Sequence, residues 1–184
     1  MVLLASLKLP MRTPAPDFSL IGIDDQKHSL AEYSKAKVLV VVFTCNHCPY
    51  AHAVWPRLVA LQEKYKDQSV QFVAINSNYN PDYPEDSFEK MKEYALKFKV
   101  NFPYLQDMTQ DIARSFKAQC TPDIYVFGQD RKLAYHGRVD DNWKEPEKVT
   151  RHELDDAIVL LLQGKVLSEE QHPSMGCSIK YRES

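Results

Sequence analysis

The sequence contains no long hydrophobic run, because none of its segments approaches the roughly 20 apolar residues of a transmembrane helix. Its first nine residues are weakly apolar, but they lack a basic start, a long apolar core and a small-residue cleavage site, so they do not predict a signal peptide. Basic residues are not in excess either, since 23 lysines and arginines stand against 25 aspartates and glutamates, a net charge of −2. We therefore expect neither a membrane nor a nucleic acid as partner, and a cytoplasmic location.

Glycine and cysteine are both scarce. The 184 residues include 5 glycines and 4 cysteines, while 44% are hydrophobic and 26% are charged, as in an ordinary globular protein. In a cytoplasmic protein, four cysteines are more often catalytic or metal-binding than a structural disulfide framework. The length suits one domain with a good core. We expect a single domain over residues 1–184, with an N-terminal extension over 14–34 and a C-terminal tail over 164–184 that has no usable periodicity.

The stretch from Val38 to Pro56 is the most informative. Residues 38–43 are all apolar and include four valines, which is typical of a strand buried on both faces. Two cysteines follow at once, and then Pro49, which suits the first position of a helix. A helix that begins there has Cys48 at its N-cap. The positive end of the helix dipole makes a thiol in that place more acidic and more reactive.

Hydrophobic periodicity predicts alternating strands and helices along the chain. The expected elements are a strand hairpin within 17–29, the buried strand 38–43, a helix over 49–65, a strand over 70–75, a helix over 88–98, a short strand over 102–105, a helix over 109–117, a hairpin of strands over 124–127 and 133–136, and a last helix that Thr150 caps and Gly164 ends. Pro56 lies inside the first helix and should kink it. The strands over 38–43 and 70–75 should be parallel, so the pattern predicts an α/β sandwich.

Three features resemble the thioredoxin fold. Cys45-Asn46-His47-Cys48 directly follows a buried strand, Thr121-Pro122 stands where such proteins carry a cis-proline facing the dithiol, and Pro56 stands where their active-site helix carries a kinking proline. The chain resembles thioredoxin-fold proteins of the alkyl hydroperoxide reductase/thiol-specific antioxidant family. Within that family it is similar to a peroxiredoxin-like branch that carries Phe-Thr-Cys-Asn-His-Cys-Pro-Tyr, as residues 43–50 do.

The resemblance extends over almost the whole chain. Its further short segments are residues 16–20, 74–78, 84–88, 120–123, 137–141 and 176–180. It implies an α/β fold of the thioredoxin-like type, a three-layer α/β/α sandwich with a mixed central sheet and an N-terminal β-hairpin extension.

Two placements of the nucleophile stay open. In one, Cys45 attacks, Cys48 resolves, and His47 resembles the histidine that stabilises the thiolate of strongly oxidising Cys-Pro-His-Cys dithiols. In the other, the spacing is counted from Phe43. Thioredoxins place the nucleophile five residues after this phenylalanine and the kinking proline thirteen after it, which here are Cys48 and Pro56. The second placement needs no gap, so we favour Cys48 as the nucleophile and Cys45 as its partner.

The resemblance implies a thiol–disulfide oxidoreductase that needs no cofactor and acts in redox homeostasis. One thiolate attacks a disulfide of a protein or small molecule, a mixed disulfide forms, and the neighbouring cysteine resolves it. Thr121 would offer its backbone to a substrate strand beside Pro122, and Cys120 and His47 complete the expected substrate-binding residues. A thioredoxin-type protein is a candidate reductant.

A thiol peroxidase is the alternative within the enzyme class. A hydroperoxide would convert Cys48 to a sulfenic acid, which Cys45 or Cys120 would resolve. Peroxiredoxins carry Pro-x-x-x-Thr-x-x-Cys at the reactive thiol. Counting back from Cys48 gives Cys45 in place of the threonine and Val41 in place of the proline. Because that motif is missing, disulfide exchange is the stronger hypothesis.

A metal carrier is the alternative from another class. Cys45, Cys48 and His52 could bind copper or zinc, because thiolates and imidazoles are ligands that these metals accept. Only three such ligands are close together in the sequence, and no second Cys-x-x-Cys occurs.

The remaining cysteines and rings give weaker signals. Cys120 is either a core residue or a third thiol close to Cys48. A cysteine such as Cys177, in the tail, is more often a structural thiol or a thiol outside any disulfide than a catalytic one. Four histidines have no recognisable partner and are expected at the surface or at caps: His28, His136, His152 and His172. Three aromatic residues lie in loops that could border the site: Tyr79, Tyr83 and Trp143.

Overall fold

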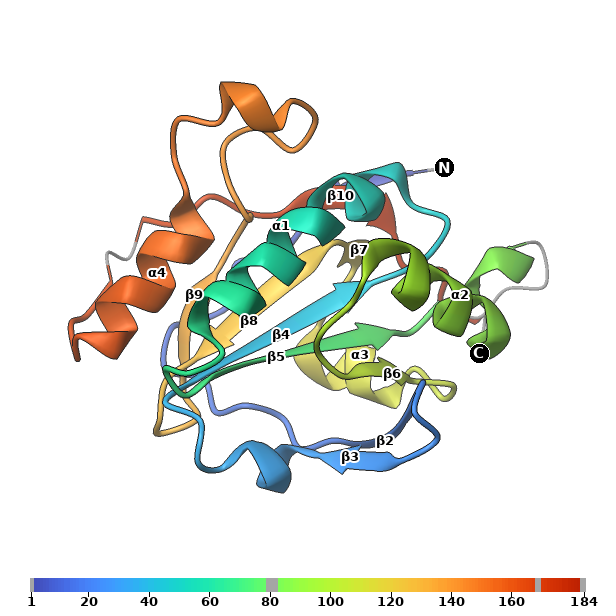
Figure 1. Ribbon diagram of the computed structural model, residues 1–184, viewed down its shortest axis with the longest axis horizontal. Helices are drawn as coiled ribbons and strands as arrows, with labels where there is room; N and C mark the ends of the chain where they lie inside the picture. The colour runs from blue at the N-terminus through green and yellow to red at the C-terminus, as the bar shows by residue number, and fades with distance from the viewer. Residues whose placement is uncertain (1, 79–82, 168–169, 183–184) are drawn as a thin grey trace.

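The computed structural model describes residues 2–78, 83–167 and 170–182. At its centre lies β4 (Val38–Thr44), every residue of which is buried, as its run of apolar side chains predicts. Six further strands join it in one sheet: β2 (Ser19–Gly22), β3 (Lys27–Ser29), β5 (Val70–Asn76), β6 (Tyr104–Gln106), β8 (Asp123–Phe127) and β9 (Leu133–His136). Their order is β3-β2-β6-β5-β4-β8-β9 (Figure 1).

The sheet is mixed. β4 pairs parallel with β5, as the sequence predicts, and antiparallel with β8. β2 and β3 form an antiparallel hairpin near the N-terminus, and β2 pairs antiparallel with β6, which joins this hairpin to the rest of the sheet. The mixed central sheet and the N-terminal hairpin are therefore both confirmed.

Helices cover both faces of the sheet (Figure 1). They are α1 (Pro49–Tyr65), α2 (Phe88–Phe98), α3 (Asp111–Phe116) and α4 (Glu153–Leu162). Successive side chains of a strand point to opposite faces. Val40 of β4 therefore belongs to one core cluster with Leu58 of α1 and Ile158 of α4, whereas Val41 belongs to a second cluster with Phe116 of α3. The predicted three-layer α/β/α arrangement is confirmed.

α1 begins at the residue that the sequence predicts. Cys48 is its N-cap with an extended backbone, and Pro49 is the first helical residue. Proline is well tolerated there because the first N–H of a helix has no partner within the helix. Pro56 lies inside the helix, which ends at Tyr65.

The last helix begins later than predicted. Its N-cap is His152 and not Thr150. The Thr150 hydroxyl donates to Oδ2 of Asp141 at 2.5 Å, and the Thr150 backbone N–H donates to Oδ1 of the same carboxylate at 2.9 Å. These two bonds hold Thr150 to the preceding loop, so it does not cap the helix.

A second sheet, which the sequence does not predict, joins both ends of the chain. Its strands are β1 (Leu3–Ala5), β7 (Cys120–Thr121) and β10 (Met175–Ser178). β10 lies in the middle and pairs antiparallel with each neighbour. Strands this short give no periodic signal, and their partners lie far away in the sequence. The C-terminal tail thus contains a strand that packs beside the start of α1 (Figure 1).

Candidate active site

Cys48 lies in a buried cluster of thiols at the start of α1. Cys45, from the loop between β4 and α1, and Cys177, from β10, belong to the same cluster, together with Ala51 of α1. Cys45 and Cys48 are 0% exposed, and Cys177 is 1% exposed. None of the four cysteines takes part in a disulfide in this structure. The two cysteines of the motif are therefore joined by a third from the far end of the chain.

Three short contacts hold the cluster together. The Sγ atoms of Cys48 and Cys177 lie 2.8 Å apart, which is longer than the about 2.05 Å of a disulfide bond. As a thiol, Cys48 also donates to the carbonyl oxygen of Thr121 at 3.1 Å. Cys45 Sγ lies 3.2 Å from the Thr121 hydroxyl oxygen. Thr121 therefore contacts both cysteines of the motif.

Cys48 is the most acidic of these thiols. The hydrogen bond with Cys45 is the main cause that lowers the pKa of Cys48 to about 5. Burial opposes this shift, while the Cys177 thiol and the backbone N–H groups of Ala51 and Cys177 add to it. Burial, followed by the hydrogen bond to Cys48, raises the pKa of Cys45 well above its usual range and that of Cys177 to about 12. At neutral pH the cluster therefore contains one thiolate, Cys48, and two thiol donors.

The peptide bond between Thr121 and Pro122 is cis, as the resemblance implies. The backbone of Thr121, however, does not form an open edge for a substrate strand. β10 pairs with β7 so that Cys177 stands opposite Thr121, and Thr121 is 1% exposed. The expected substrate edge is thus occupied by the chain's own C-terminal strand.

Cys120 lies on the same small sheet but contacts a different group. Its Sγ lies 3.8 Å from the carbonyl oxygen of Pro122, and burial raises the pKa of its thiol. The thiol from outside the motif that contacts Cys48 is therefore Cys177, which the sequence analysis did not place at the site. The one sequence signal near it is the short segment 176–180, which carries part of the resemblance.

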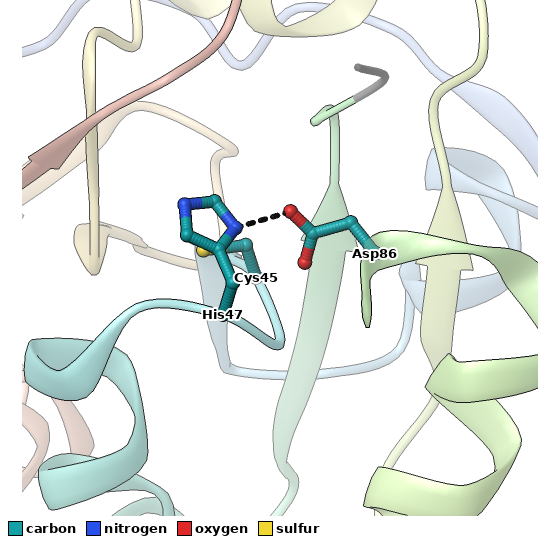
Figure 2. Close-up of side chains that lie close together, drawn as sticks. All are labelled: Cys45, His47 and Asp86. Carbon is teal, nitrogen blue, oxygen red and sulfur yellow. Dashed lines mark hydrogen bonds and ion pairs between the residues drawn. The ribbon is translucent and has the colours of Figure 1, made fainter. Parts of the chain in front are cut away.

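His47 pairs with a carboxylate (Figure 2). Its Nδ1 lies 2.5 Å from Oδ2 of Asp86, in the short helix η2 (Pro84–Asp86), and the two side chains are 5% and 2% exposed. Asp86 Oδ1 accepts the backbone N–H of Asn46 at 2.6 Å. The ring of Tyr83 stacks on His47 with centroids 4.4 Å apart. The two residues between the motif cysteines thus fasten the active-site loop to η2.

The predicted metal ligands are not brought together. His52 Nε2 contacts the carbonyl oxygen of Asn46, and its ring packs against Tyr94 and Phe98. Burial is the main cause that lowers the pKa of His52. His52 therefore fills a space between α1 and α2 and does not join Cys45 and Cys48 in a ligand set.

A different trio is close enough to hold a metal. Within the described residues, ligand atoms of Cys45, His47 and Asp86 lie within 4.8 Å of one another (Figure 2). Both Asp86 oxygens and His47 Nδ1 already take part in hydrogen bonds. His47 Nε2 is the buried atom of this trio that has no hydrogen-bond partner. Asp86 therefore acts as a hydrogen-bonded clamp that holds the loop between β4 and α1 to η2.

His136 is buried, and its expected place at the surface is wrong. Its Nε2 lies 2.8 Å from Oδ1 of Asp123, and its ring stacks on Tyr125 with centroids 4.2 Å apart. β9 ends at His136 and pairs it with Tyr125 of β8. Two other histidines also have acidic neighbours: His28 lies 3.0 Å from Asp24, and His172 lies 3.7 Å from Glu153.

Aromatic side chains border the thiol cluster. Tyr50 packs against the cluster and against the ring of Trp143, with centroids 4.1 Å apart. A cavity of about 330 Å³ lies beside them, and its lining includes Pro122, Trp143 and Met175. Tyr83 contacts His47 as described, whereas Tyr79 lies outside the described residues. Of the three aromatic residues expected near the site, Tyr83 therefore contacts the motif, and Trp143 contacts Tyr50 close after it.

None of the helices in the described ranges has the length and apolar character that a membrane span requires. The fold and the cysteine cluster together define a thioredoxin-like protein with a candidate thiol-based site. Residues 11–136 match the model of the AhpC/TSA family, and the chain belongs to this family.

Several known proteins are similar to this chain in sequence or in structure. A structure from Geobacillus kaustophilus, described as an uncharacterized conserved protein, is 40% identical, with a TM-score of 0.94 over 100% of this chain and 98% of that one. A thiol:disulfide interchange protein of the thioredoxin family from Chlorobium tepidum shares the fold, with a TM-score of 0.66, 19% identity and coverage of 84% and 99%. A probable phospholipid hydroperoxide glutathione peroxidase from Helianthus annuus is 31% identical over 47% of this chain and 48% of its own length. The chain spans about half the length of such curated relatives.

Proposed function

We propose that the protein is a thiol–disulfide oxidoreductase in which Cys48 is the nucleophile. The observation that carries this proposal is the position of Cys48 at the start of α1 in direct contact with other thiols. The lowered pKa of about 5 makes Cys48 a thiolate at neutral pH, and the thiolate is the form that attacks disulfides. The contact of Cys48 with the residue before the cis-proline also supports this role.

The reaction has two steps. The Cys48 thiolate attacks one sulfur of a substrate disulfide, that S–S bond breaks, and the other substrate sulfur leaves as a thiolate that takes up a proton. Cys48 is then joined to the substrate in a mixed disulfide. A neighbouring thiol gives up its proton, attacks the Cys48 sulfur and releases the second half of the substrate as a thiol. The Cys-x-x-Cys motif by itself predicts Cys45 for this second step, and Cys177 is the other thiol in contact with Cys48.

The electrons come from the thiols themselves, so the cycle needs no cofactor. Small-molecule or protein disulfides are the proposed substrates, and a thioredoxin-type protein would return the site to its reduced form. We also propose a cytoplasmic location, because that compartment keeps thiols reduced and the proposed reaction starts from a thiolate. We propose that residues 1–184 act as one domain.

One observation favours a thiol peroxidase as a second candidate. Cys48 is fully buried, and such a thiolate is reached more readily by a small hydroperoxide than by a folded protein. Cys48 would attack the O–O bond, take one oxygen as a sulfenic acid and release an alcohol or water. A neighbouring thiol would then condense with the sulfenic acid and lose water.

The test compares oxidised glutathione and hydrogen peroxide as substrates of the reduced protein. Cys48→Ser should react with neither. The double variant Cys45→Ser/Cys177→Ser should accumulate a glutathione mixed disulfide on Cys48, because no neighbouring thiol can resolve it. Cys120→Ser is the matched control and should behave like the natural protein. A glutathione adduct on Cys45 in Cys48→Ser would move the nucleophile to Cys45, and much faster consumption of peroxide than of disulfide would favour the second candidate.

A further inference from the structure

β10 presents Cys177 to Cys48 in the place where a substrate strand is expected. The strand runs antiparallel to β7, with Cys177 opposite Thr121 and Ser178 opposite Cys120. Figure 1 shows β10 beside β7, next to the first turn of α1. Cys177 therefore approaches Cys48 across the same edge of Thr121 that the sequence analysis assigns to a substrate.

The close approach of β10 requires a glycine. A Cβ atom at position 176 would lie 1.9 Å from the Thr121 carbonyl oxygen and 2.6 Å from the Thr121 carbonyl carbon. Real side chains do not approach backbone atoms this closely, so any other residue would push β10 away from β7. Gly176 thus sets the distance at which Cys177 meets Cys48.

Hydrogen bonds on both sides keep β10 in place. On one side its pairing with β1 puts Leu3 opposite Cys177, and the Ser178 backbone N–H donates to the Val2 carbonyl at 2.8 Å. Beyond the strand, the Ile179 N–H donates to the Gln119 carbonyl at 2.9 Å. The Cys177 sulfur is therefore delivered by a strand that is anchored at both edges.

We propose that Cys177 is the thiol that resolves the mixed disulfide on Cys48, so that the oxidised protein carries a Cys48–Cys177 bond. This inference rests on the proposed function, because it takes Cys48 as the nucleophile. In the step, the Cys177 thiol loses its proton and attacks Cys48 Sγ, the bond from Cys48 to the substrate sulfur breaks, and that sulfur leaves and takes up the proton. The two cysteines lose two electrons in the full cycle, and the substrate disulfide gains them as two thiols.

The surroundings favour Cys177 over Cys45 for this step. Cys177 Sγ is already 2.8 Å from Cys48 Sγ, whereas Cys45 is engaged by the Thr121 hydroxyl at 3.2 Å. Burial raises the pKa of both thiols, but the nearby charge of Lys180 partly offsets this rise at Cys177, whereas the charge of Asp86 adds to it at Cys45. Loss of a proton is therefore less opposed at Cys177 than at Cys45. Cys45 then acts as the hydrogen-bond donor that keeps Cys48 ionised.

The sequence makes the disulfide easy to map. Cleavage after lysine and arginine releases residues 38–57 with both motif cysteines, 118–131 with Cys120, and 166–180 with Cys177. The experiment treats the reduced full-length protein with one equivalent of oxidised glutathione and maps the bonds by mass spectrometry without reduction. It compares the natural protein with Cys45→Ser, Cys177→Ser, Cys177→Ala and the control Cys120→Ser.

The expected product is a link between peptides 38–57 and 166–180 in the natural protein, in Cys45→Ser and in Cys120→Ser. Both variants at position 177 should accumulate the glutathione adduct on Cys48 at least tenfold above the natural protein, while far-ultraviolet circular dichroism confirms that they fold. A bond within peptide 38–57 in the natural protein, with no adduct in the variants at position 177, would overturn the role of Cys177 and leave the proposed function intact. No reaction of Cys48 in any protein would overturn both.

Discussion

The Sγ atoms of Cys48 and Cys177 lie 2.8 Å apart although 129 positions separate the two residues in the chain. The contact exists because β10 pairs with β7 at Thr121, directly before the cis-proline. The chemistry of Cys48 thus depends on two structures at once. α1 and Cys45 favour its thiolate, and β10 brings the Cys177 sulfur into contact with it.

Cys48 should titrate far below an ordinary thiol. Its pKa of about 5, against about 8.5 for a thiol in water, means that its thiolate persists down to about pH 5 and is lost below it. The thiolate absorbance of the reduced protein, and the rate of alkylation of peptide 38–57 by iodoacetamide, should therefore fall half-way near pH 5. Cys45→Ala should raise this midpoint, because it removes the donor of the hydrogen bond that is the largest cause of the shift.

Cys120→Ser provides the control for this titration, since Cys120 contacts the Pro122 carbonyl oxygen and makes no contribution among the main causes of the Cys48 shift. The titration midpoint of Cys48 in this variant should equal that in the natural protein. A midpoint near pH 8.5 in the natural protein would mean that Cys48 is not the activated thiol.

The sequence predicts the part of the site that is contiguous. The apolar run before Cys45 gives β4, and Pro49 gives the start of α1, because burial and the missing N–H of proline are local properties. These two elements determine that Cys48 is an N-cap residue. Local rules were therefore enough to favour the residue that the structure makes the most acidic thiol.

The contribution of β10 could not be predicted in the same way. Met175–Ser178 has no hydrophobic alternation to identify it, and its partners lie near residues 3–5 and 120–121. Its position depends on the absence of a side chain at Gly176 and on hydrogen bonds between distant backbone groups. The expected surface position of His136 is wrong for a related reason, since its partner Asp123 belongs to another strand. Pairings between distant strands leave little trace in a single sequence.

Gly176→Ala should loosen β10. The new Cβ would lie 1.9 Å from the Thr121 carbonyl oxygen, and overpacking of this kind costs about 1–3 kcal/mol. We expect a loss of this size in the free energy of unfolding of the reduced protein and faster labelling of Cys48 by a bulky maleimide. Gly128→Ala is the matched control, because its Cβ would meet the Asp130 side chain at 3.3 Å. Equal labelling rates in the two variants would show that β10 does not cover Cys48.

Asp86→Asn should weaken the clamp on the active-site loop. The Asp86 carboxylate accepts from His47 and from the Asn46 backbone, and bonds to a charged group contribute about 1.5–3 kcal/mol each. We expect urea unfolding to give a loss of about 1–3 kcal/mol. The thiol of Cys45 should also become more acidic, because the Asp86 charge contributes to its raised pKa. Glu85→Gln changes the exposed neighbouring carboxylate and should leave both properties unchanged.

His136→Leu should destabilise the strands beside the cis-proline. It leaves the buried Asp123 carboxylate with the Tyr125 hydroxyl as its remaining side-chain partner among those described here. Removing one member of a buried pair costs about 3–5 kcal/mol, and thermal or urea unfolding would measure it. His172→Leu is the control, since that side chain is 44% exposed and such changes stay within about 0.5 kcal/mol. Similar losses in both variants would contradict a structural role for the His136–Asp123 pair.

Oxidation should stabilise the protein by an amount that depends on which thiols pair. In the chain-entropy account, closing a loop between Cys48 and Cys177, which are 129 positions apart, lowers the free energy of folding by about 5 kcal/mol, against about 2 kcal/mol for the short Cys45–Cys48 loop. Unfolding by urea, with and without prior oxidation, measures this difference directly. Cys45→Ser should keep the larger stabilisation and Cys177→Ser should lose it. Equal, small stabilisation of the natural protein and Cys177→Ser would mean that the bond forms within the motif and that β10 is held by hydrogen bonds alone.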